Sequence, residues 1–250
     1  MKQTRLRPQG SRRGWLLLLL VAILLAVVVT VVFLFSQGYS MNITRTRHVL
    51  SWLRDPGAYE AWNVQGGLRC GEAPFMMPTS GFIGFLWDDS FRIGHQHQGI
   101  DVFGGGELNV TPVVAAYPGY LTRLPEWKST VIVRIPDDPL QPGRQIWTYY
   151  THMADPGGDS FISEAFPPGT FEEFIEAGTL LGYQGNYSGD PGNPTGVHLH
   201  FSIVKDDGSG EFLNELEIKN TLDPSPYLGM PLNARQNEGD VPLCNDQVDS

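Results

Sequence analysis

Five of the six histidines in this chain of 250 residues lie in three short segments that are far apart in the sequence. The segments are HQHQGID (95–101), YYTHM (149–153) and GVHLHF (196–201), and the sixth histidine is His48. Histidines placed at random would not gather in this way, and imidazole is the commonest metal ligand in proteins. A shared metal ion would require a fold that brings these three segments to one place.

The spacing within the segments suits a metal site on a β-sheet. His198 and His200 are two residues apart in a strand-like run, so their side chains are expected on the same face of the sheet. His97 and Asp101 are four residues apart, but Gly99 between them disfavours a helix. A turn that leads into a strand is expected there instead. Catalytic zinc takes three protein ligands and leaves a fourth position for water, and histidine and aspartate are suitable donors.

The N-terminus carries five basic residues and no acidic residue, and an apolar run from residue 15 to residue 35 follows. At about 1.5 Å per residue, this run can cross a hydrocarbon core of about 30 Å. A cleaved signal peptide is the alternative, but its apolar stretch is usually only about 7–15 residues long. We expect a cytoplasmic basic segment (1–14) and an uncleaved transmembrane anchor (15–35), which makes this a single-pass cytoplasmic membrane protein with the rest of the chain extracellular or periplasmic.

The part of the chain after residue 36 carries 12 basic and 27 acidic residues, a net charge of −15. This balance argues against a nucleic-acid partner, because nucleic-acid binding needs a basic face. The same part holds both cysteines, Cys70 and Cys244, in what should be an oxidising compartment. A disulfide between them is favoured over two free buried thiols.

The remaining sequence predicts a mainly β fold. From about residue 67, short runs rich in β-branched or aromatic residues alternate with glycine and proline turns. Strands are expected at 111–116, 119–124, 130–135, 145–151, 180–183 and 198–204, and antiparallel pairing follows from their short connections. Helices are expected at 170–177 (TFEEFIEA) and around residues 49–53. We divide this part into a stalk (36–66), a β-rich domain (67–230) and a polar tail (231–250).

The three histidine segments together resemble the lysostaphin-like (LytM-type) zinc endopeptidases, a family of peptidoglycan hydrolases built on a small antiparallel β-sheet. The similarity rests on HQGID at 97–101, YTHM at 150–153 and HLHF at 198–201. Further parts of the family pattern are similar to TPVVAA at 111–116 and GTLLG at 178–182. The resemblance covers roughly residues 74–229. It implies a small antiparallel catalytic sheet with few short helices.

The resemblance also implies one Zn²⁺ ion held by His97, Asp101 and His200. It assigns catalytic roles to two other histidines, His152 and His198. A different register, in which His95 is a ligand, stays open because His95 and His97 form a second H-x-H pair.

Residues around the histidines are expected to shape a substrate groove. Strand alternation puts Tyr150 on the same face as His152, so Tyr150 is expected to bind substrate, whereas Tyr149 is expected in the core. The loop 187–195 is expected to border the groove. The segment 155–177 is expected to form one of its walls.

These observations predict a zinc-dependent endopeptidase that hydrolyses peptide cross-links or stem peptides of peptidoglycan outside the cytoplasmic membrane. The sequence contains neither H-E-x-x-H nor G-x-S-x-G, which are signatures of other hydrolases. Two alternatives stay open: a catalytically silent LytM-type module that binds cell wall or regulates another hydrolase, and a zinc peptidase that acts on secreted proteins. The sequence gives no indication of an oligomeric state.

Overall fold

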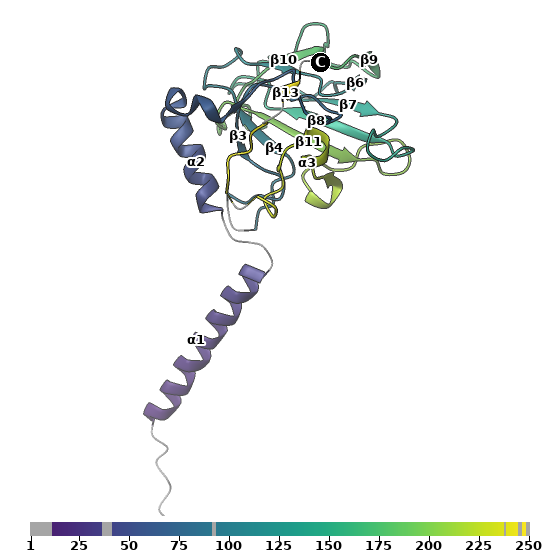
Figure 1. The fold of residues 1–250 in the computed structure, drawn as a ribbon. Helices are drawn as coiled ribbons and strands as arrows, with labels where there is room; N and C mark the ends of the chain where they lie inside the picture. Colours follow the sequence, from purple (N-terminus) through teal and green to yellow (C-terminus); the bar gives the residue numbers. More distant parts are fainter. Residues whose placement is uncertain (1–11, 37–41, 92–93, 238, 245–246, 249–250) are drawn as a thin grey trace, which may run out of the picture.

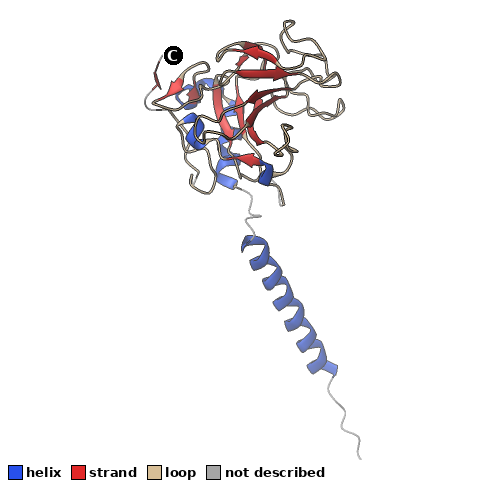
Figure 2. Ribbon diagram, turned by 90° about the vertical axis from the view of Figure 1, so that its right-hand side faces the viewer, coloured by secondary structure: helices blue, strands red, loops and turns tan. Residues whose placement is uncertain are grey.

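The computed structural model describes residues 12–36, 42–91, 94–237, 239–244 and 247–248. It contains one long N-terminal helix and a β-rich body, in which long loops surround the strands (Figures 1 and 2). The helical elements are α1 (Arg12–Ser36), α2 (Ile43–Arg54), the 3₁₀ helix η1 (Pro56–Trp62), the 3₁₀ helix η2 (Ile218–Asn220) and α3 (Ser225–Leu228).

Helix α1 is long and apolar enough to cross a membrane over Gly14–Phe33, and none of this stretch is buried against the rest of the chain. Its leucines and valines are therefore exposed in the absence of a bilayer. The helix expected from the apolar run is confirmed. A signal sequence near an N-terminus can also meet these criteria of length and hydropathy, so the helix is compatible with either role.

The strands are short, and every pairing between them is antiparallel. The main sheet has the order β1-β3-β4-β11-β8-β7-β6-β9, with β12 paired to β11, and two further pairs are β10-β5 and β13-β2. The strands are β1 (Asn63–Val64), β2 (Arg69–Cys70), β3 (Gly81–Phe85), β4 (Ile100–Phe103), β5 (Pro112–Val114), β6 (Gly119–Thr122), β7 (Val131–Ile135), β8 (Ile146–Thr151), β9 (Glu173–Ile175), β10 (Leu180–Tyr183), β11 (Leu199–Lys205), β12 (Thr221–Leu222) and β13 (Gln247–Val248).

This architecture confirms the expected mainly β, antiparallel fold with few short helices. All six expected strands are present, as β5, β6, β7, β8, β10 and β11. The helix expected at 170–177 is wrong, because β9 forms there and pairs with β6. Ile175 is buried in the core from this strand. An isolated eight-residue helix is only marginally stable, so strand pairing and burial override its local preference.

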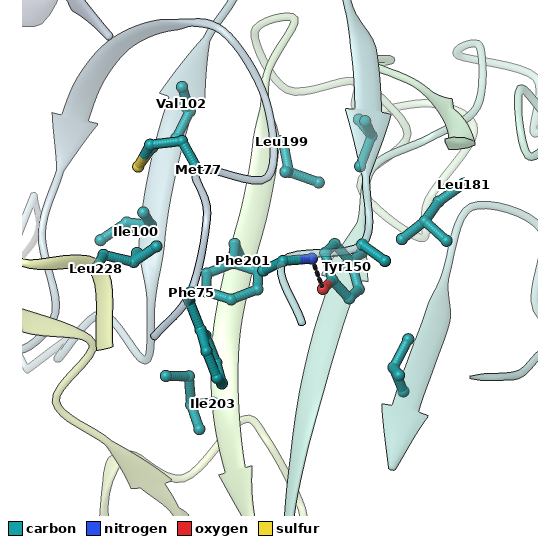
Figure 3. Packing of buried hydrophobic residues seen from close by; sticks show 14 of the residues in the cluster. Phe75, Met77, Ile100, Val102, Tyr150, Leu181, Leu199, Phe201, Ile203 and Leu228 are labelled. Atoms are coloured by element: carbon teal, nitrogen blue, oxygen red, sulfur yellow. Dashed lines mark hydrogen bonds between the residues drawn. The ribbon is translucent and has the colours of Figure 1, made fainter. Parts of the chain in front are cut away.

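The main core packs against one face of the central strands (Figure 3). Along β11, Leu199, Phe201 and Ile203 point into this core and are fully buried. The alternate residues, His200 and Ser202, point to the opposite face. The sheet thus separates an apolar core from the face that carries the histidines.

Tyr150 belongs to the core and does not line a groove, so its expected role in substrate binding is corrected. Its ring packs against Phe201 at a centroid distance of 5.2 Å, and its hydroxyl accepts a hydrogen bond of 2.9 Å from the backbone N–H of Ala116 (Figure 3). Burial raises the pKa of Tyr150 to about 12. The alternation that linked Tyr150 to His152 fails because β8 ends at Thr151 and His152 has a φ of 75°.

Helix α2 packs against the edge of the sheet rather than standing free. Val49 and Trp52 on one face of the helix contact Phe82 and Phe103 in an apolar cluster, and the rings of Trp52 and Phe82 stack at 5.7 Å. Such an apolar stripe is typical of a helix docked on a core. The amphipathic helix expected around residues 49–53 is confirmed, whereas the exact division into stalk, domain and tail stays a prediction.

A buried arginine attaches α2 to the body. Arg45 is fully buried and lies 3.6 Å from the carboxylate of Asp89. Its guanidinium also donates to the backbone carbonyl of Asp240 (2.8 Å) and to the side-chain oxygen of Asn237 (3.0 Å). Because burial disfavours the charged form, the pKa of Arg45 is lowered even though Asp89 and Asp240 oppose the shift.

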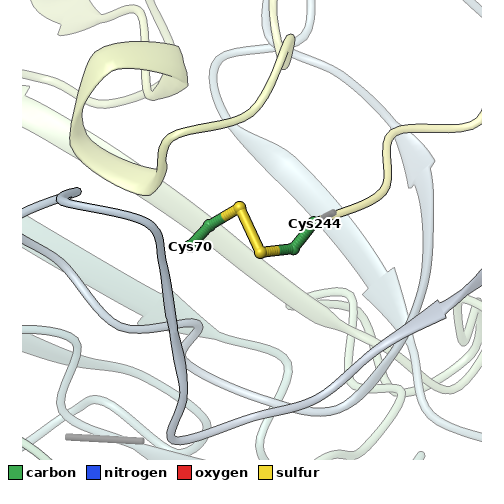
Figure 4. Close-up of a disulfide and its surroundings, with 2 residues drawn as sticks. All are labelled: Cys70 and Cys244. Atoms are coloured by element: carbon green, nitrogen blue, oxygen red, sulfur yellow. A yellow bond between two sulfur atoms is a disulfide. The ribbon is translucent and has the colours of Figure 1, made fainter. Parts of the chain in front are cut away.

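The expected disulfide is present between Cys70 and Cys244 (Figure 4). It joins residues 174 positions apart in the sequence, and both cysteines pack against the main core. In the chain-entropy model, a bridge that closes such a long loop stabilises the fold by restricting the unfolded chain. It links the last part of the chain to β2.

We predict that the double substitution Cys70→Ala/Cys244→Ala lowers the free energy of unfolding by about 4–5 kcal/mol, the chain-entropy value for a loop of this size. Denaturant unfolding without reductant measures this change. Wild type unfolded in the presence of reductant should match the variant. Equal unfolding midpoints for wild type and variant under oxidising conditions would contradict the prediction.

We predict that Tyr150→Phe lowers the free energy of unfolding by about 1–3 kcal/mol, because it leaves the buried N–H of Ala116 without its acceptor. The ring itself is retained, so the packing against Phe201 persists. Denaturant unfolding measures the change, and a variant as stable as wild type would show that this hydrogen bond contributes nothing.

Candidate metal centre

Three neighbouring strands bring together residues from distant parts of the sequence. In the pairing of β4 with β11, Asp101 lies opposite His200, and in the pairing of β11 with β8, His200 lies opposite Thr151. Side chains directly opposite each other on one face of a sheet have Cβ atoms about 4.5–5.5 Å apart. The register therefore places a carboxylate and an imidazole side by side on the face opposite the main core.

His97 completes the cluster from the turn before β4. Its backbone N–H donates to the carbonyl of Asp89, and its own carbonyl accepts from the N–H of Asp88, each at 2.8 Å. Gly99 allows the turn to approach β11, since a Cβ at this position would lie 2.1 Å from the carbonyl oxygen of Phe201. The glycine between the histidine and Asp101 is thus required by close packing against a neighbouring strand.

The three side chains converge on a common point. The distances are 3.0 Å from Nε2 of His97 to Oδ1 of Asp101, 2.8 Å from Nδ1 of His200 to the same oxygen, and 3.0 Å between the two ring nitrogens. All three residues are buried, and they form the group that can hold a metal ion among the described residues.

The outward-facing nitrogens of the two imidazoles have acceptors of their own. Nδ1 of His97 lies 3.0 Å from the carbonyl oxygen of Leu86, and Nε2 of His200 lies 2.8 Å from a carboxylate oxygen of Glu215. Each of these nitrogens can therefore carry a proton and donate it outward. The other nitrogen of each ring is then directed at Asp101.

The charges in the cluster are strongly coupled. Burial alone would raise the pKa of Asp101, but the neighbouring His97 and His198 outweigh it and hold the pKa well below its usual range. Burial alone would lower the pKa of His200, but Glu215 and Asp101 outweigh it and raise the pKa to about 10. In the metal-free chain at neutral pH, His200 is therefore protonated and Asp101 is ionised. The proton on Nδ1 of His200 then lies between this ring and Asp101, at the position that a bound cation would take.

The donor set fits a zinc ion. Bond lengths of about 2.0–2.2 Å in tetrahedral geometry put ligand atoms about 3.3–3.6 Å apart, close to the separations found here. The carbonyl and carboxylate behind the imidazoles are the outer partners that metal-binding histidines usually have. His97, Asp101 and His200 could hold one such ion once the proton between them is displaced.

His152 and His198 lie beside the cluster and have a different environment. Their rings are 4.5 Å apart, and Nε2 of His198 is 3.6 Å from the carboxylate of Asp101. Nδ1 of each ring lies within hydrogen-bond distance of a backbone carbonyl, that of Tyr187 (2.6 Å) for His152 and that of Gly196 (2.7 Å) for His198. Each Nδ1 can thus donate its proton, which leaves Nε2 as the nitrogen with a free lone pair.

Both of these histidines are neutral at physiological pH. Burial lowers the pKa of His152 to about 3, with a smaller contribution from the neighbouring His198 and His200. Burial also lowers the pKa of His198, although Asp101 opposes the shift. Four of the clustered histidines therefore divide into a pair suited to a cation, His97 and His200, and a neutral pair suited to proton transfer, His152 and His198.

The cluster lies in an open groove of about 750 Å³. Its lining includes the histidines, Val49 and Leu53 of α2, aromatic side chains such as Trp127 and Tyr149, and the turn that carries Glu215. The groove thus combines apolar walls with a few converging polar groups, as ligand sites usually do.

The lining of the groove can be compared with the expectations for the two loops, the tyrosines and His95. The loop 187–195 borders it, as expected, through Tyr187 and Thr195, and Tyr149 lines it in place of Tyr150. The segment 155–177 supplies no described lining residue, so that expectation is wrong: Ile162 and Phe166 of this segment are buried in the main core. His95 also lines the groove, but the metal cluster is formed with His97.

Several residues at the site have no signal in the sequence. Glu215 lies outside every motif, and it contacts His200 only because the chain turns back after β11. Asp89 also lies outside the motifs, and its backbone carbonyl accepts from the N–H of His97. Gln98 lies inside HQGID, but the motif does not predict its contact with the carbonyl of Leu216. An acidic residue in a polar loop is ordinarily read as a solvated side chain, so these contacts needed the folded structure.

No protein-family model matches the chain, and no curated protein sequence matches it. Solved structures are similar to it. One is the catalytic domain of the antimicrobial peptidase lysostaphin from Staphylococcus simulans, with 18% identity, a TM-score of 0.36, and coverage of 60% of this chain and 89% of that one. Another is the catalytic domain, in mutant form, of the prophage-encoded M23 protein EnpA from Enterococcus faecalis, with 20% identity, a TM-score of 0.37, and coverage of 60% and 95%. At this level of similarity no residue role is transferred from either protein to this chain.

Proposed function

We propose that this protein is a lysostaphin-like (LytM-type) zinc endopeptidase that hydrolyses peptide bonds in the cross-links or stem peptides of peptidoglycan. The observation that carries the proposal is the meeting of His97, Asp101 and His200, whose ligand atoms lie 2.8–3.0 Å from one another in an open groove. The order of the motifs in the sequence, which resembles that family, supports the same activity.

The chain's own residues suit hydrolysis of an amide. A bound zinc ion supplies Lewis-acid polarisation of the scissile carbonyl and activation of water at neutral pH. His152 and His198 are neutral, and each can present Nε2 with a lone pair toward the groove. One imidazole can accept the proton of the attacking water at Nε2, and the imidazolium formed in this way can donate to the oxyanion and then pass the same proton to the leaving amine.

The groove suits an extended peptide. It is open to solvent, and its lining includes no described residue of the segment 155–177. This accessibility favours an active enzyme over a silent module whose site is closed by its own loop. The substrate class itself rests on the family resemblance, because a fold alone does not define a substrate.

We further propose that α1 anchors the protein in the cytoplasmic membrane with the basic N-terminus inside. The apolar stretch Gly14–Phe33 and the positive charges before it support this orientation. The catalytic groove would then lie outside the membrane, where peptidoglycan is found. The disulfide between Cys70 and Cys244 is consistent with an oxidising compartment.

The test of the proposed activity is chelator-sensitive release of peptide fragments from purified peptidoglycan. The full chain in detergent is compared with Asp101→Ala, and mass spectrometry of the fragments identifies the bond cleaved. Stoichiometric zinc together with defined peptide products is the expected result. Zinc binding without any cleavage of peptidoglycan would instead favour the silent module or a peptidase for secreted proteins.

We predict that His152→Ala and His198→Ala each lower kcat by about 10²–10⁴-fold, since each removes a group that transfers a proton. Both variants should retain one zinc ion per chain, whereas Asp101→Ala should lose it. Zinc content and cleavage rate are measured on the same preparations. His48→Ala, which lies in α2 away from the cluster, is the matched control. Full activity in both histidine variants would refute their catalytic roles.

We predict that zinc binding tightens as pH rises. In the metal-free chain the pKa of His200 is raised to about 10, so its proton must leave before the ring can bind a cation. Below this pKa, the apparent Kd for Zn²⁺ should fall by about tenfold for each unit of pH between 6 and 8. Competition with a chelator of known pH dependence measures the effect. A Kd independent of pH would show that no proton is displaced.

A further inference from the structure

Glu215 is a buried carboxylate that the proposed hydrolytic steps do not use. Its side chain is only 10% exposed, and its described ion-pair partner is His200, at 2.8 Å from Nε2. Placing an ionised carboxylate away from water is costly unless charged or hydrogen-bonded groups compensate for it. The contact with His200 is therefore the interaction that compensates for placing this carboxylate away from water.

The turn that carries Glu215 is held rigidly at the site. The side chain of Asn214 accepts from the N–H of Leu216 (3.1 Å), and the side chain of Asn220 donates to the carbonyl of Asn214 (2.9 Å). Gln98, next to the ligand His97, donates to the carbonyl of Leu216 (2.9 Å). The turn thus contacts both ligand-bearing segments, one through Gln98 and the other through Glu215.

Glu215 and Asp101 contact opposite nitrogens of the same ring. Nε2 of His200 faces Glu215, and Nδ1 faces Asp101. A neutral imidazole carries one proton, so an acceptor at Nε2 selects the tautomer in which Nδ1 has the free lone pair. A carboxylate behind a ligating imidazole also makes the ring a stronger donor. Glu215 itself is not among the three residues whose ligand atoms cluster.

We infer that Glu215 is a positioning residue, which holds His200 in the tautomer and orientation that bind the metal through Nδ1. The inference rests on the proposed metal site, and it assigns a function to a residue outside the histidine motifs. Glu215 acts on the metal site through the ring of His200. Substitution of Glu215 should therefore weaken metal binding strongly and change the stability of the fold little.

The experiment compares the full chain in detergent with Glu215→Ala and Glu215→Gln. Glutamine has the same shape and keeps an acceptor oxygen but lacks the charge, so it separates the hydrogen bond from the charge. Glu217→Gln is the matched control, because Glu217 is half-exposed and pairs with Lys219. Zinc affinity is measured by chelator competition, and the visible spectrum of the Co²⁺-substituted protein reports the ligand geometry.

We expect Glu215→Ala to weaken zinc binding by about 10–100-fold and Glu215→Gln to weaken it less. Both should alter the Co²⁺ spectrum while their thermal unfolding midpoints stay within a few degrees of wild type. Glu217→Gln should leave all three measurements unchanged. Unchanged zinc affinity and an unchanged spectrum in both Glu215 variants would overturn the inference.

The same measurements keep this inference distinct from the proposed function. If wild type binds zinc but cleaves no peptide, the peptidase activity fails, and the effect of Glu215 on zinc affinity still decides the inference. If wild type cleaves peptide and the Glu215 variants bind zinc normally, only the role of Glu215 fails. A wild-type chain that binds no zinc would refute both.

Discussion

The candidate site depends on the antiparallel register of β4, β11 and β8, which aligns Asp101, His200 and Thr151 across three adjacent strands. A slip of one residue in β11 would turn His200 into the core and bring Phe201 to the groove, because side chains alternate along a strand. The burial of Leu199, Phe201 and Ile203 on the core face opposes such a slip. The hydrophobic core and the position of the candidate ligand His200 are therefore set by the same pairing.

Electrostatics divides histidines of identical chemistry into two kinds. His200 lies between two carboxylates, Asp101 and Glu215, and this environment favours a positive charge at the ring. At His152 and His198, loss of contact with water lowers the pKa and favours the neutral form, although hydrogen bonds to backbone carbonyls oppose this shift. The neutral pair thus lies beside a centre that attracts a cation. This arrangement is what hydrolysis by a metal ion and a general base requires.

Helix α2 is connected to the candidate metal centre by packing and by an ion pair. Arg45 of α2 pairs with Asp89, and the backbone carbonyl of Asp89 holds the N–H of His97. Val49 and Leu53 of the same helix line the groove. Helix α2, which follows α1 in the sequence, is therefore part of the structure that supports the candidate ligand His97, and the docking of α2 is physically connected to the geometry of the site.

Much of this arrangement could be predicted from the sequence alone. Runs of β-branched and aromatic residues between glycine and proline turns identified the strands that became β5 to β8, β10 and β11, and the family resemblance of the histidine motifs implied the set His97, Asp101 and His200. These features are local, because a strand or a motif can be recognised from a short segment of the sequence. The apolar α1 and the amphipathic α2 were predictable for the same reason.

Other features were decided only by the tertiary structure. The region 170–177 has a helical pattern, but pairing with β6 and burial of Ile175 made it a strand. Tyr150 and Tyr149 exchanged their expected places because His152 adopts a left-handed backbone conformation at the end of β8. Glu215 reached His200 through a turn without a sequence signature. Each of these outcomes depends on which distant segments meet, and no local pattern contains that information, because it arises from the packing of the whole chain.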